Sequence, residues 1–156
     1  MISTKPEPSA SIDNERDIAI NRLLMVDDNR LDNLFHRLLI EKTGLVGEVV
    51  CLESSEEALE WLAAPDNTAE VMLVDINMTG ISGFELVERF NQSARPDQMG
   101  MTIMIMSASS YLDDIERAKA LDNVSGFIEK PLLQDNVKHF AGVGPEPANL
   151  LFRSEY

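Results

Sequence analysis

Residues 71–86 read VMLVDINMTGISGFEL, and this stretch decides the expected fold. The four apolar residues before Asp75 form a run of strand length without polar alternation, which is typical of a strand buried on both faces. Ser82 and Glu85 then form a capping box, which predicts that a helix begins there. The stretch therefore predicts a buried strand that ends at an aspartate and leads through a short loop into a helix.

Similar apolar runs recur along the chain and alternate with segments of helical period. The other four runs are Leu23–Val26, Val49–Leu52, Thr102–Met106 and Gly126–Ile128. The helices between them are expected to bury their periodic apolar residues. These inward positions are Leu31, Leu34, Phe35, Leu38 and Leu39 in the first helix, Ala58, Leu59 and Leu62 in the second, Phe84, Val87 and Phe90 in the third, Leu112, Ile115 and Ala118 in the fourth, and Leu133, Val137, Phe140 and Ala141 in the fifth, with Pro131 as its first residue.

A strand–helix unit repeated five times predicts an α/β fold of the flavodoxin-like (βα)5 type, a doubly wound parallel sheet with strand order 2-1-3-4-5. The folded domain is expected to span residues 21–141. Residues 1–20 are expected to form a flexible N-terminal tail, because residues 1–17 hold almost no apolar side chains. Residues 142–156 form a C-terminal extension, and its apolar residues 150–152 are expected to contact the domain or a partner.

The composition and charge of the chain argue against several classes of function. The 156 residues are enough for one domain, and Asp and Glu outnumber Lys and Arg by 27 to 13, which gives a net charge of -14. This charge argues against binding to nucleic acid or to an anionic membrane surface. The longest apolar runs are far too short to span a bilayer, and the single cysteine, Cys51, allows no intramolecular disulfide. We therefore expect a cytoplasmic protein, and its two histidines, His36 and His139, are expected on the surface.

Charged and hydroxyl side chains stand where the expected strands end. The first strand ends at Asp27 and Asp28, the third at Asp75, the fourth at Ser107 and the fifth at Lys130. The carboxyl ends of parallel strands share one edge of the sheet, so these side chains are expected to converge there. Three crowded carboxylates need a proton or a cation, and an all-oxygen site without histidine or cysteine suits Mg²⁺ better than zinc. A carboxylate beside a divalent ion and a lysine suits phosphoryl transfer to that carboxylate.

Four pieces of the chain, taken in order, resemble the receiver domain of a two-component response regulator. They are LLMVDDN at 23–29, VMLVDINMTGISGFEL at 71–86, TIMIMSAS at 102–109 and GFIEKP at 126–131. Any one of these pieces alone is a weak signal, but the whole set in order is highly specific. The resemblance covers about residues 21–141.

The resemblance implies a role for each residue at the expected edge of the sheet. Asp75 matches the aspartate that accepts a phosphoryl group, and Lys130 matches the lysine that acts beside it. The residues that match the Mg²⁺ ligands are Asp27, Asp28, Asp75 and, through its backbone carbonyl, Asn77. The implied cofactor is therefore Mg²⁺.

Further positions match the parts of the family that respond to phosphorylation. Ser107 matches the switch Ser/Thr, which also acts at the phosphoryl group, and Phe127 matches the switch aromatic. Gly83 matches the loop glycine that opens the third helix, and the bond before Pro131 is commonly cis in the family. Thr79 departs from the family pattern, because a proline often stands there, and this departure predicts a less rigid loop.

The implied function is signalling and not enzymatic. A sensor histidine kinase or a histidine phosphotransfer protein would donate the phosphoryl group to Asp75 in a Mg²⁺-dependent reaction. The chain would then signal by conformational switching and by partner binding or onward phosphotransfer to a downstream protein target. Residues 142–156 are too few for an output domain, so we expect a stand-alone receiver. It is expected to be a monomer or a phosphorylation-dependent dimer that binds neither nucleic acid nor membrane.

Three other functions are alternatives. A haloacid-dehalogenase-type phosphatase has a DxDxT motif that residues 75–79 resemble, but Asn77 stands where the motif needs its general acid. A flavodoxin needs a phosphate loop rich in glycine and hydroxyl groups, whereas DDNRLD at 27–32 would repel phosphate. A receiver-like module that is never phosphorylated would usually lack part of the acidic set or the lysine, and all of them are present here.

Several of the residues at the expected site also have purely structural explanations. Asn29 or Asp28 suits the N-cap of the first helix, and Ser107 suits that of the fourth. Phe127 suits an ordinary core aromatic, and its switch role rests on the resemblance alone.

Overall fold

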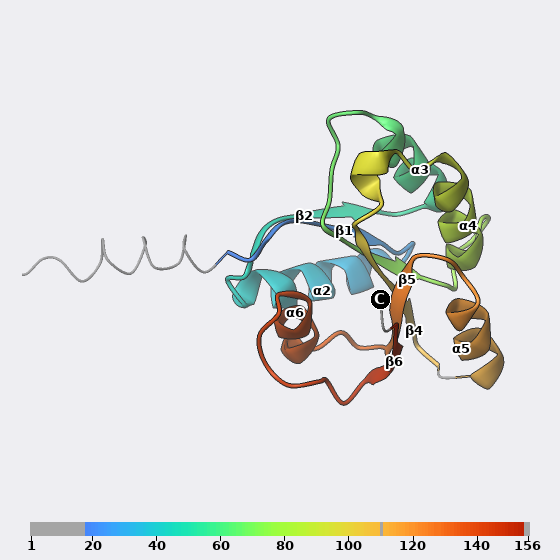
Figure 1. The fold of residues 1–156 in the computed structure, drawn as a ribbon. Helices are drawn as coiled ribbons and strands as arrows, with labels where there is room; N and C mark the ends of the chain where they lie inside the picture. Colours follow the sequence, from blue (N-terminus) through green and yellow to red (C-terminus); the bar gives the residue numbers. More distant parts are fainter. Residues whose placement is uncertain (1–17, 110, 155–156) are drawn as a thin grey trace, which may run out of the picture.

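The fold is described by a computed structural model of residues 18–109 and 111–154 (Figure 1). It contains one six-stranded sheet with strand order β2-β1-β3-β4-β5-β6. The strands are β1 (Ile20–Val26), β2 (Val46–Leu52), β3 (Val71–Asp75), β4 (Thr102–Ser107), β5 (Val124–Glu129) and β6 (Leu150–Arg153). The helices are α2 (Arg30–Lys42), α3 (Ser55–Ala63), α4 (Gly83–Ser93), the 3-10 helix η1 (Pro96–Gln98), α5 (Leu112–Lys119) and α6 (Gln134–Phe140). Residues 1–17 of the expected tail lie outside the described residues.

Helices cover both faces of the sheet and form two core layers. Helices α2 and α6 lie on one face, and α3, α4 and α5 lie on the other (Figure 1). In β1, Leu24 and Val26 join the core of α3, α4 and α5, whereas Leu23 and Met25 join the core of α2 and α6. All four side chains are fully buried, which explains why the strands lack polar alternation. No described helix is long and apolar enough to cross a membrane.

The first five strands confirm the predicted sheet. They run parallel to one another in the order 2-1-3-4-5. The sixth strand, β6, runs antiparallel to β5 and extends the sheet beyond the prediction. Its four residues are too short a signal for a strand, so the sequence indicates only an apolar segment there.

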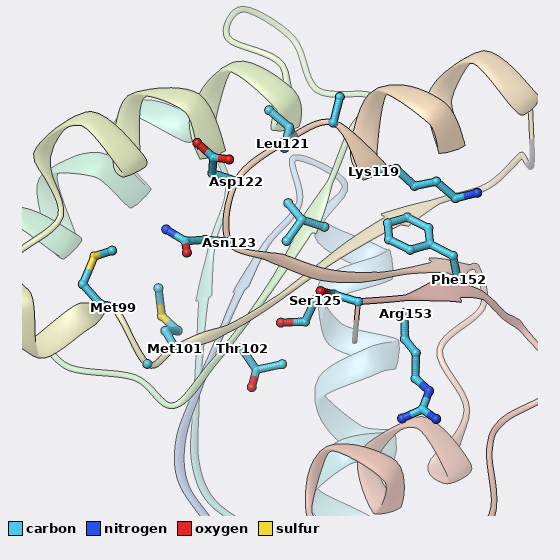
Figure 2. Close-up of a pocket in the computed structure, with 14 residues that line it drawn as sticks. Met99, Met101, Thr102, Lys119, Leu121, Asp122, Asn123, Ser125, Phe152 and Arg153 are labelled. Carbon is cyan, nitrogen blue, oxygen red and sulfur yellow. The ribbon is translucent and has the colours of Figure 1, made fainter. Parts of the chain in front are cut away.

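Strand β6 covers the outer edge of β5. Phe152 is the register partner of Phe127, and the centroids of the two rings lie 6.5 Å apart. The ammonium of Lys119 lies 5.7 Å from the centroid of the Phe152 ring, and both side chains line a pocket of about 1090 Å³ (Figure 2). Leu150 packs against the core layer of α2 and α6, and Leu151 packs against the opposite layer. These contacts confirm the expectation that residues 150–152 contact the domain.

We expect Phe152→Ala to lower the free energy of unfolding by about 1–3 kcal/mol, because it removes a half-buried ring from the contact with Phe127. Urea denaturation measures this change. The matched control is Arg153→Ala in the same strand, whose ion pair with the exposed Glu146 at 3.0 Å is worth less than about 1 kcal/mol. A Phe152→Ala variant as stable as the wild type would show that β6 adds nothing to the fold.

The expected inward face of the first helix is wrong. Asn33, His36 and Ile40 are the buried residues of α2. The amide of Asn33 donates to the Asp27 carbonyl at 2.8 Å, and His36 Nε2 accepts from the Leu132 N–H at 3.3 Å. Polar residues turn inward here because they satisfy backbone groups of two loops, a demand that apolar periodicity does not count. The prediction that His36 is a surface residue is wrong for the same reason.

Four of the five leucine and phenylalanine residues that were expected to face inward lie on the surface instead. Their side chains are between 53% and 75% exposed. We call this set the α2 apolar face, and it consists of Leu31, Leu34, Phe35 and Leu38. The helix therefore presents an apolar stripe to solvent on the outside of the domain.

The fifth expected helix begins later than predicted. Helix α6 starts at Gln134, and Pro131 instead follows a cis peptide bond in the loop before it. The Leu133 N–H donates to the side-chain oxygen of Asn136 at 2.7 Å, which fixes the start of the helix. Residues 130–133 are therefore a loop that connects β5 to α6 and are not a first helical turn.

The other helices bury the expected faces, with one exception. In α5, Leu112 is 69% exposed, because only the later turns with Ile115 and Ala118 pack against the core. The positions in α3 and α4 that are buried as expected are Ala58, Leu62, Phe84, Val87 and Phe90.

Candidate functional site

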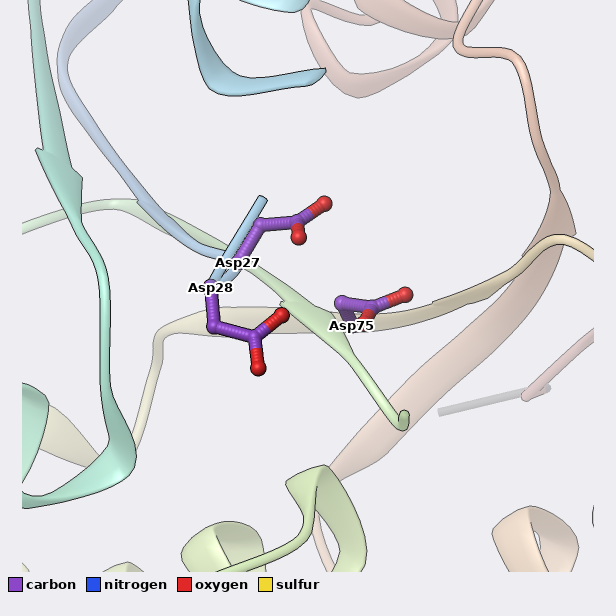
Figure 3. A group of neighbouring side chains, drawn as sticks. All are labelled: Asp27, Asp28 and Asp75. Carbon is purple, nitrogen blue, oxygen red and sulfur yellow. The ribbon is translucent and has the colours of Figure 1, made fainter. Parts of the chain in front are cut away.

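Three carboxylates meet at the carboxyl ends of β1 and β3 (Figure 3). Asp27, Asp28 and Asp75 each offer one oxygen, and these oxygens all lie within 4.8 Å of one another. Asp27 is 1% exposed and Asp75 is 4% exposed, whereas Asp28 is exposed. The structure therefore brings the three predicted aspartates together and holds two of them away from water.

The sheet and the following helix set the position of Asp75. Val26 of β1 is the register partner of Val74 of β3. The residues that follow them, Asp27 and Asp75, therefore lie side by side at the end of the two strands. Gly83 at the start of α4 lies close behind, because an added Cβ there would stand 2.3 Å from the Asp75 carbonyl oxygen. A larger residue at position 83 would displace the end of β3 or the start of α4.

Lys130 reaches this cluster from the loop after β5. Its Nζ lies 2.6 Å from a carboxylate oxygen of Asp27 and 3.0 Å from those of Asp32 and Asp75. The lysine side chain is only 11% exposed. Its backbone N–H donates to the Ser107 carbonyl at 2.7 Å, which ties the loop to the end of β4. One ammonium thus faces carboxylates from the residue after β1, from the end of β3 and from α2.

The electrostatics of the cluster are strongly coupled. Burial raises the pKa of Asp75 from 3.8 to about 6; the attraction of Lys130 works against this shift, and the charge of Asp27 adds to it. Burial alone would lower the pKa of Lys130, but its hydrogen bond to Asp27 and the charge of Asp75 raise that pKa. At neutral pH the lysine is therefore charged and Asp75 is mainly ionised, so negative charge outweighs positive charge.

Asp28 is held by the loop that follows β3. Its carboxylate accepts from the Thr79 N–H at 2.7 Å and from the Thr79 hydroxyl at 2.8 Å. These two bonds lower the pKa of Asp28 below its usual value. A proline at position 79 has neither an N–H nor a hydroxyl, so Thr79 supplies a tether that the usual family residue could not.

The donor set fits Mg²⁺. The three clustered aspartates offer oxygens only, which are the ligands that this ion prefers. Three carboxylates contact the single ammonium of Lys130, and Asp28 adds a fourth to the cluster, so a divalent cation would offset the surplus negative charge. Asn77 is exposed and lies two residues beyond the end of β3, and its carbonyl stays a predicted ligand.

Ser107 and Phe127 occupy different surroundings. Ser107 ends β4 and is fully buried, and its hydroxyl accepts from the Ser109 N–H at 3.2 Å. It does not cap the next helix, since α5 begins only at Leu112. Phe127 is fully buried in β5 and packs against Phe152. Ser107 therefore lies at the edge that carries the aspartates, whereas Phe127 is part of the core.

Sequence reasoning missed the roles of three residues that shape the site. Asp32 contacts Lys130 from the first turn of α2, where Asn29 caps the helix by accepting from the Asp32 N–H at 3.0 Å. An acidic residue in a capped first turn is a signal that could have found it. Thr79 stands out in the sequence only as a departure from the family pattern, and nothing local signals its two bonds to Asp28. Asn149 gives no local signal either, although its side chain binds the loop around Lys130.

Comparisons with known proteins agree with this geometry. A family model described as the response regulator receiver domain matches residues 23–141. The virulence sensor protein BvgS of Bordetella pertussis is 31% identical over 103 residues, which are 64% of this chain and 8% of that protein. The two-component response regulator ORR1 of Oryza sativa subsp. japonica is 25% identical over 132 residues, which are 81% of this chain and 56% of that protein. This chain thus spans less than two thirds of the length of these curated relatives.

A solved structure shares the fold. The crystal structure of a two component response regulator from Cytophaga hutchinsonii superposes with a TM-score of 0.72 at 28% identity. The superposition covers 79% of this chain and 95% of that one. The family match contains every clustered aspartate and Lys130, and it stops before β6 begins at Leu150.

Proposed function

The chain belongs to the response regulator receiver domain family, and on this premise we propose that it accepts a phosphoryl group on Asp75 from a phosphohistidine of a partner protein. The observation that carries the proposal is the cluster in which the buried Asp75 shares its space with Asp27, Asp28 and Lys130. Receiver domains are signalling domains, so the product is a phosphorylated protein and not a released metabolite. The single cysteine fits a reducing compartment, and we place the reaction in the cytoplasm.

Asp75 is the nucleophile of the proposed reaction. One of its carboxylate oxygens attacks the phosphorus, a P–O bond forms while the P–N bond to histidine breaks, and the imidazole nitrogen keeps the electron pair. Lys130, with its ammonium 3.0 Å from Asp75, is placed to stabilise the negative charge on the transferred oxygens. Because the lysine is already fixed by Asp27, it needs little rearrangement when that charge arrives.

Asp27, Asp28 and Asp75 would hold Mg²⁺, with the Asn77 carbonyl as a further protein ligand. When bound, this ion supplies Lewis-acid stabilisation of the charge on the transferred group. Asp28 is ionised throughout the physiological range, because its bonds to Thr79 lower its pKa, so it offers a charged oxygen without first losing a proton.

Ser107 and Phe127 would carry the response to phosphorylation. The Ser107 hydroxyl, now bonded to Ser109, would turn toward the new phosphoryl oxygens and donate to one of them. Phe127 lies on the neighbouring strand β5 and contacts Phe152, so repacking of β5 would reach β6. A downstream protein target would read this change through partner binding, phosphorylation-dependent dimerisation or onward phosphotransfer.

The proposed donor is a sensor histidine kinase or a histidine phosphotransfer protein. The name of one relative, the virulence sensor protein BvgS, supports a partner from the sensor proteins. The α2 apolar face supports docking beside the site, because its helix starts at Arg30, only two residues beyond Asp28. A partner that buries this stripe would bring its phosphohistidine to the sheet edge that carries Asp75.

We expect the double variant Leu34→Ser/Leu38→Ser to lower the rate of phosphotransfer from a phosphorylated histidine phosphotransfer protein by about tenfold or more, since it removes two exposed anchors from the docking surface. Acetyl phosphate, which needs no docking surface, should phosphorylate the variant at the wild-type rate. Leu112→Ser is the matched control, because this leucine is also exposed but belongs to α5 on the other face of the sheet. Wild-type phosphotransfer by the double variant would exclude docking on α2.

Incubation with acetyl phosphate and Mg²⁺, followed by intact mass measurement, tests the proposed function. A single labile phosphoryl adduct should form, and it should be absent when a chelator removes the metal. In that reaction the P–O bond to acetate breaks, and acetate leaves with the electron pair. A chain that acquires no adduct would refute the proposal, turnover of free phosphate esters would favour the phosphatase, and a stable flavin absorbance would favour a flavodoxin.

A further inference from the structure

We infer that Asn149 is a positioning residue for Lys130, so that the C-terminal segment beyond the receiver match helps to build the phosphoryl-transfer site. This inference rests on the proposed function, since the reaction that Lys130 serves is proposed there. Asn149 lies beyond residue 141, where the family match ends, so the match assigns it no role.

The side-chain amide of Asn149 bridges the carbonyl groups of the two residues that flank Lys130. Its Nδ2 donates to the Glu129 carbonyl at 2.9 Å and to the Pro131 carbonyl at 3.0 Å. The Glu129 N–H in turn donates to the Asn149 carbonyl at 2.9 Å. Three hydrogen bonds thus fasten the backbone before and after the lysine to one residue.

Asn149 is itself held in place. Asn136 Nδ2 donates to the Asn149 side-chain oxygen at 2.8 Å, and Asn149 Nδ2 lies 2.9 Å from the Asn136 side-chain oxygen. Asn136 is fully buried at the start of α6, and the residue after Asn149 begins β6. The Asn149 side chain, with its bonds to the Glu129 and Pro131 carbonyls, is therefore anchored to both a helix and the sheet. We call this arrangement the Asn149 clamp, and it restricts the motion of the loop that carries Lys130.

Lys130 needs such support because it stands on a loop. Its long side chain loses rotational freedom when the ammonium stays within 3.0 Å of Asp27, Asp32 and Asp75. Besides Asn149, the backbone of this loop is held by the Lys130 N–H on the Ser107 carbonyl, by the Leu132 N–H on His36 and by the Leu133 N–H on Asn136. Misplacement by about 1 Å can cost about 100-fold in rate, so a loosened loop should slow the transfer.

The alternative explanation is that Asn149 only fastens β6 to the sheet. Phe152→Ala separates the two explanations, because it weakens the packing of β6 while leaving every bond of the Asn149 amide in place. A role in fastening predicts that both variants behave alike. A role in positioning predicts that only the Asn149 variants disturb Lys130.

The experiment compares full-length Asn149→Ala, Asn149→Asp and Phe152→Ala with the wild type. Asn149→Asp can still accept from Asn136 but has no N–H for the two carbonyls, so it tests the clamp if the alanine variant folds poorly. We expect both Asn149 variants to lower the maximal rate of phosphorylation by acetyl phosphate at least about tenfold, while the Kd for Mg²⁺ changes less than about twofold. Phe152→Ala should keep the wild-type rate despite its lower stability.

A second measurement does not depend on phosphorylation. The NMR order parameter of the Lys130 side chain at Cε should fall in the Asn149 variants and stay unchanged in Phe152→Ala. If the wild type takes no phosphoryl group, the proposed function fails, and the order parameter still decides the inference. An unchanged rate with an unchanged order parameter in the Asn149 variants, or an equal loss in Phe152→Ala, would overturn it.

Discussion

Asp75→Asn is expected to take up no phosphoryl group from acetyl phosphate and Mg²⁺. An amide oxygen carries no negative charge and is a poor nucleophile. The proposed function gives the acceptor role to Asp75 and leaves the other buried carboxylate, Asp27, as a metal ligand that holds Lys130. Intact mass measurement should show the unmodified chain after the wild type is fully converted. Asp66→Asn, in an exposed loop, is the control and should be phosphorylated like the wild type. An adduct that persists in Asp75→Asn would assign the acceptor to another residue.

The same substitution should raise stability above pH 6. The pKa of Asp75 is about 6 in the folded protein, and its ordinary value is 3.8. Above pH 6 the folded protein therefore carries a buried carboxylate whose charge is less favourable than the same charge in the unfolded chain. A shift of about two pKa units corresponds to at most about 3 kcal/mol, which Asp75→Asn should recover in metal-free buffer at pH 7.5. As the pH falls through 6 toward 3.8, the wild-type carboxyl binds its proton and the advantage should vanish. Urea denaturation at several pH values measures this trend, and an advantage independent of pH would contradict it.

Lys130→Met is expected to have the second largest effect, a fall in the phosphorylation rate of about 100-fold or more, because it removes a positive charge that is already aligned on the transferred group. It should also lower the free energy of unfolding by about 3 kcal/mol at pH 8, since the buried Asp27 and Asp75 lose their ammonium partner. Rate measurements with acetyl phosphate and urea denaturation without metal follow the two effects.

Two controls make the lysine variant interpretable. Lys42→Met replaces an exposed lysine at the end of α2 and should change neither the rate nor the stability. Added Mg²⁺ should raise the stability of Lys130→Met more than that of the wild type, because the ion offsets the negative charges that the missing ammonium no longer offsets. A Lys130→Met variant with wild-type rate would mean that the metal alone stabilises the transferred group.

The site could be predicted from the sequence because its main residues stand at strand ends. Buried parallel strands are visible as short apolar runs, and the first residues beyond each run lie at one edge of the sheet, so Asp27, Asp75 and Lys130 could be grouped without coordinates. Their actual separations, down to 2.6 Å, depend on loop conformations that no run of residues encodes.

The failures have a common physical cause. In α2 the apolar stripe points to solvent because Asn33 and His36 satisfy backbone groups on the inner side. In the C-terminal segment Asn149 binds the loop around Lys130 through side-chain bonds that leave no periodic trace. Sequence patterns indicate which apolar side chains are buried. The burial of Asn33 and His36 and the contacts of Asn149 depend instead on hydrogen bonds to residues that are not adjacent in the sequence.

Strand β6 also matters for anyone who shortens this chain. A fragment that stops at residue 141, where the family match ends, keeps all the clustered aspartates but loses Leu150–Arg153. The outer side of β5 would then be bare, with a row of unpaired N–H and C=O groups that invites pairing with another molecule. Such a fragment should aggregate or exchange strands, and it also lacks Asn149, so expression boundaries for this protein belong beyond Arg153.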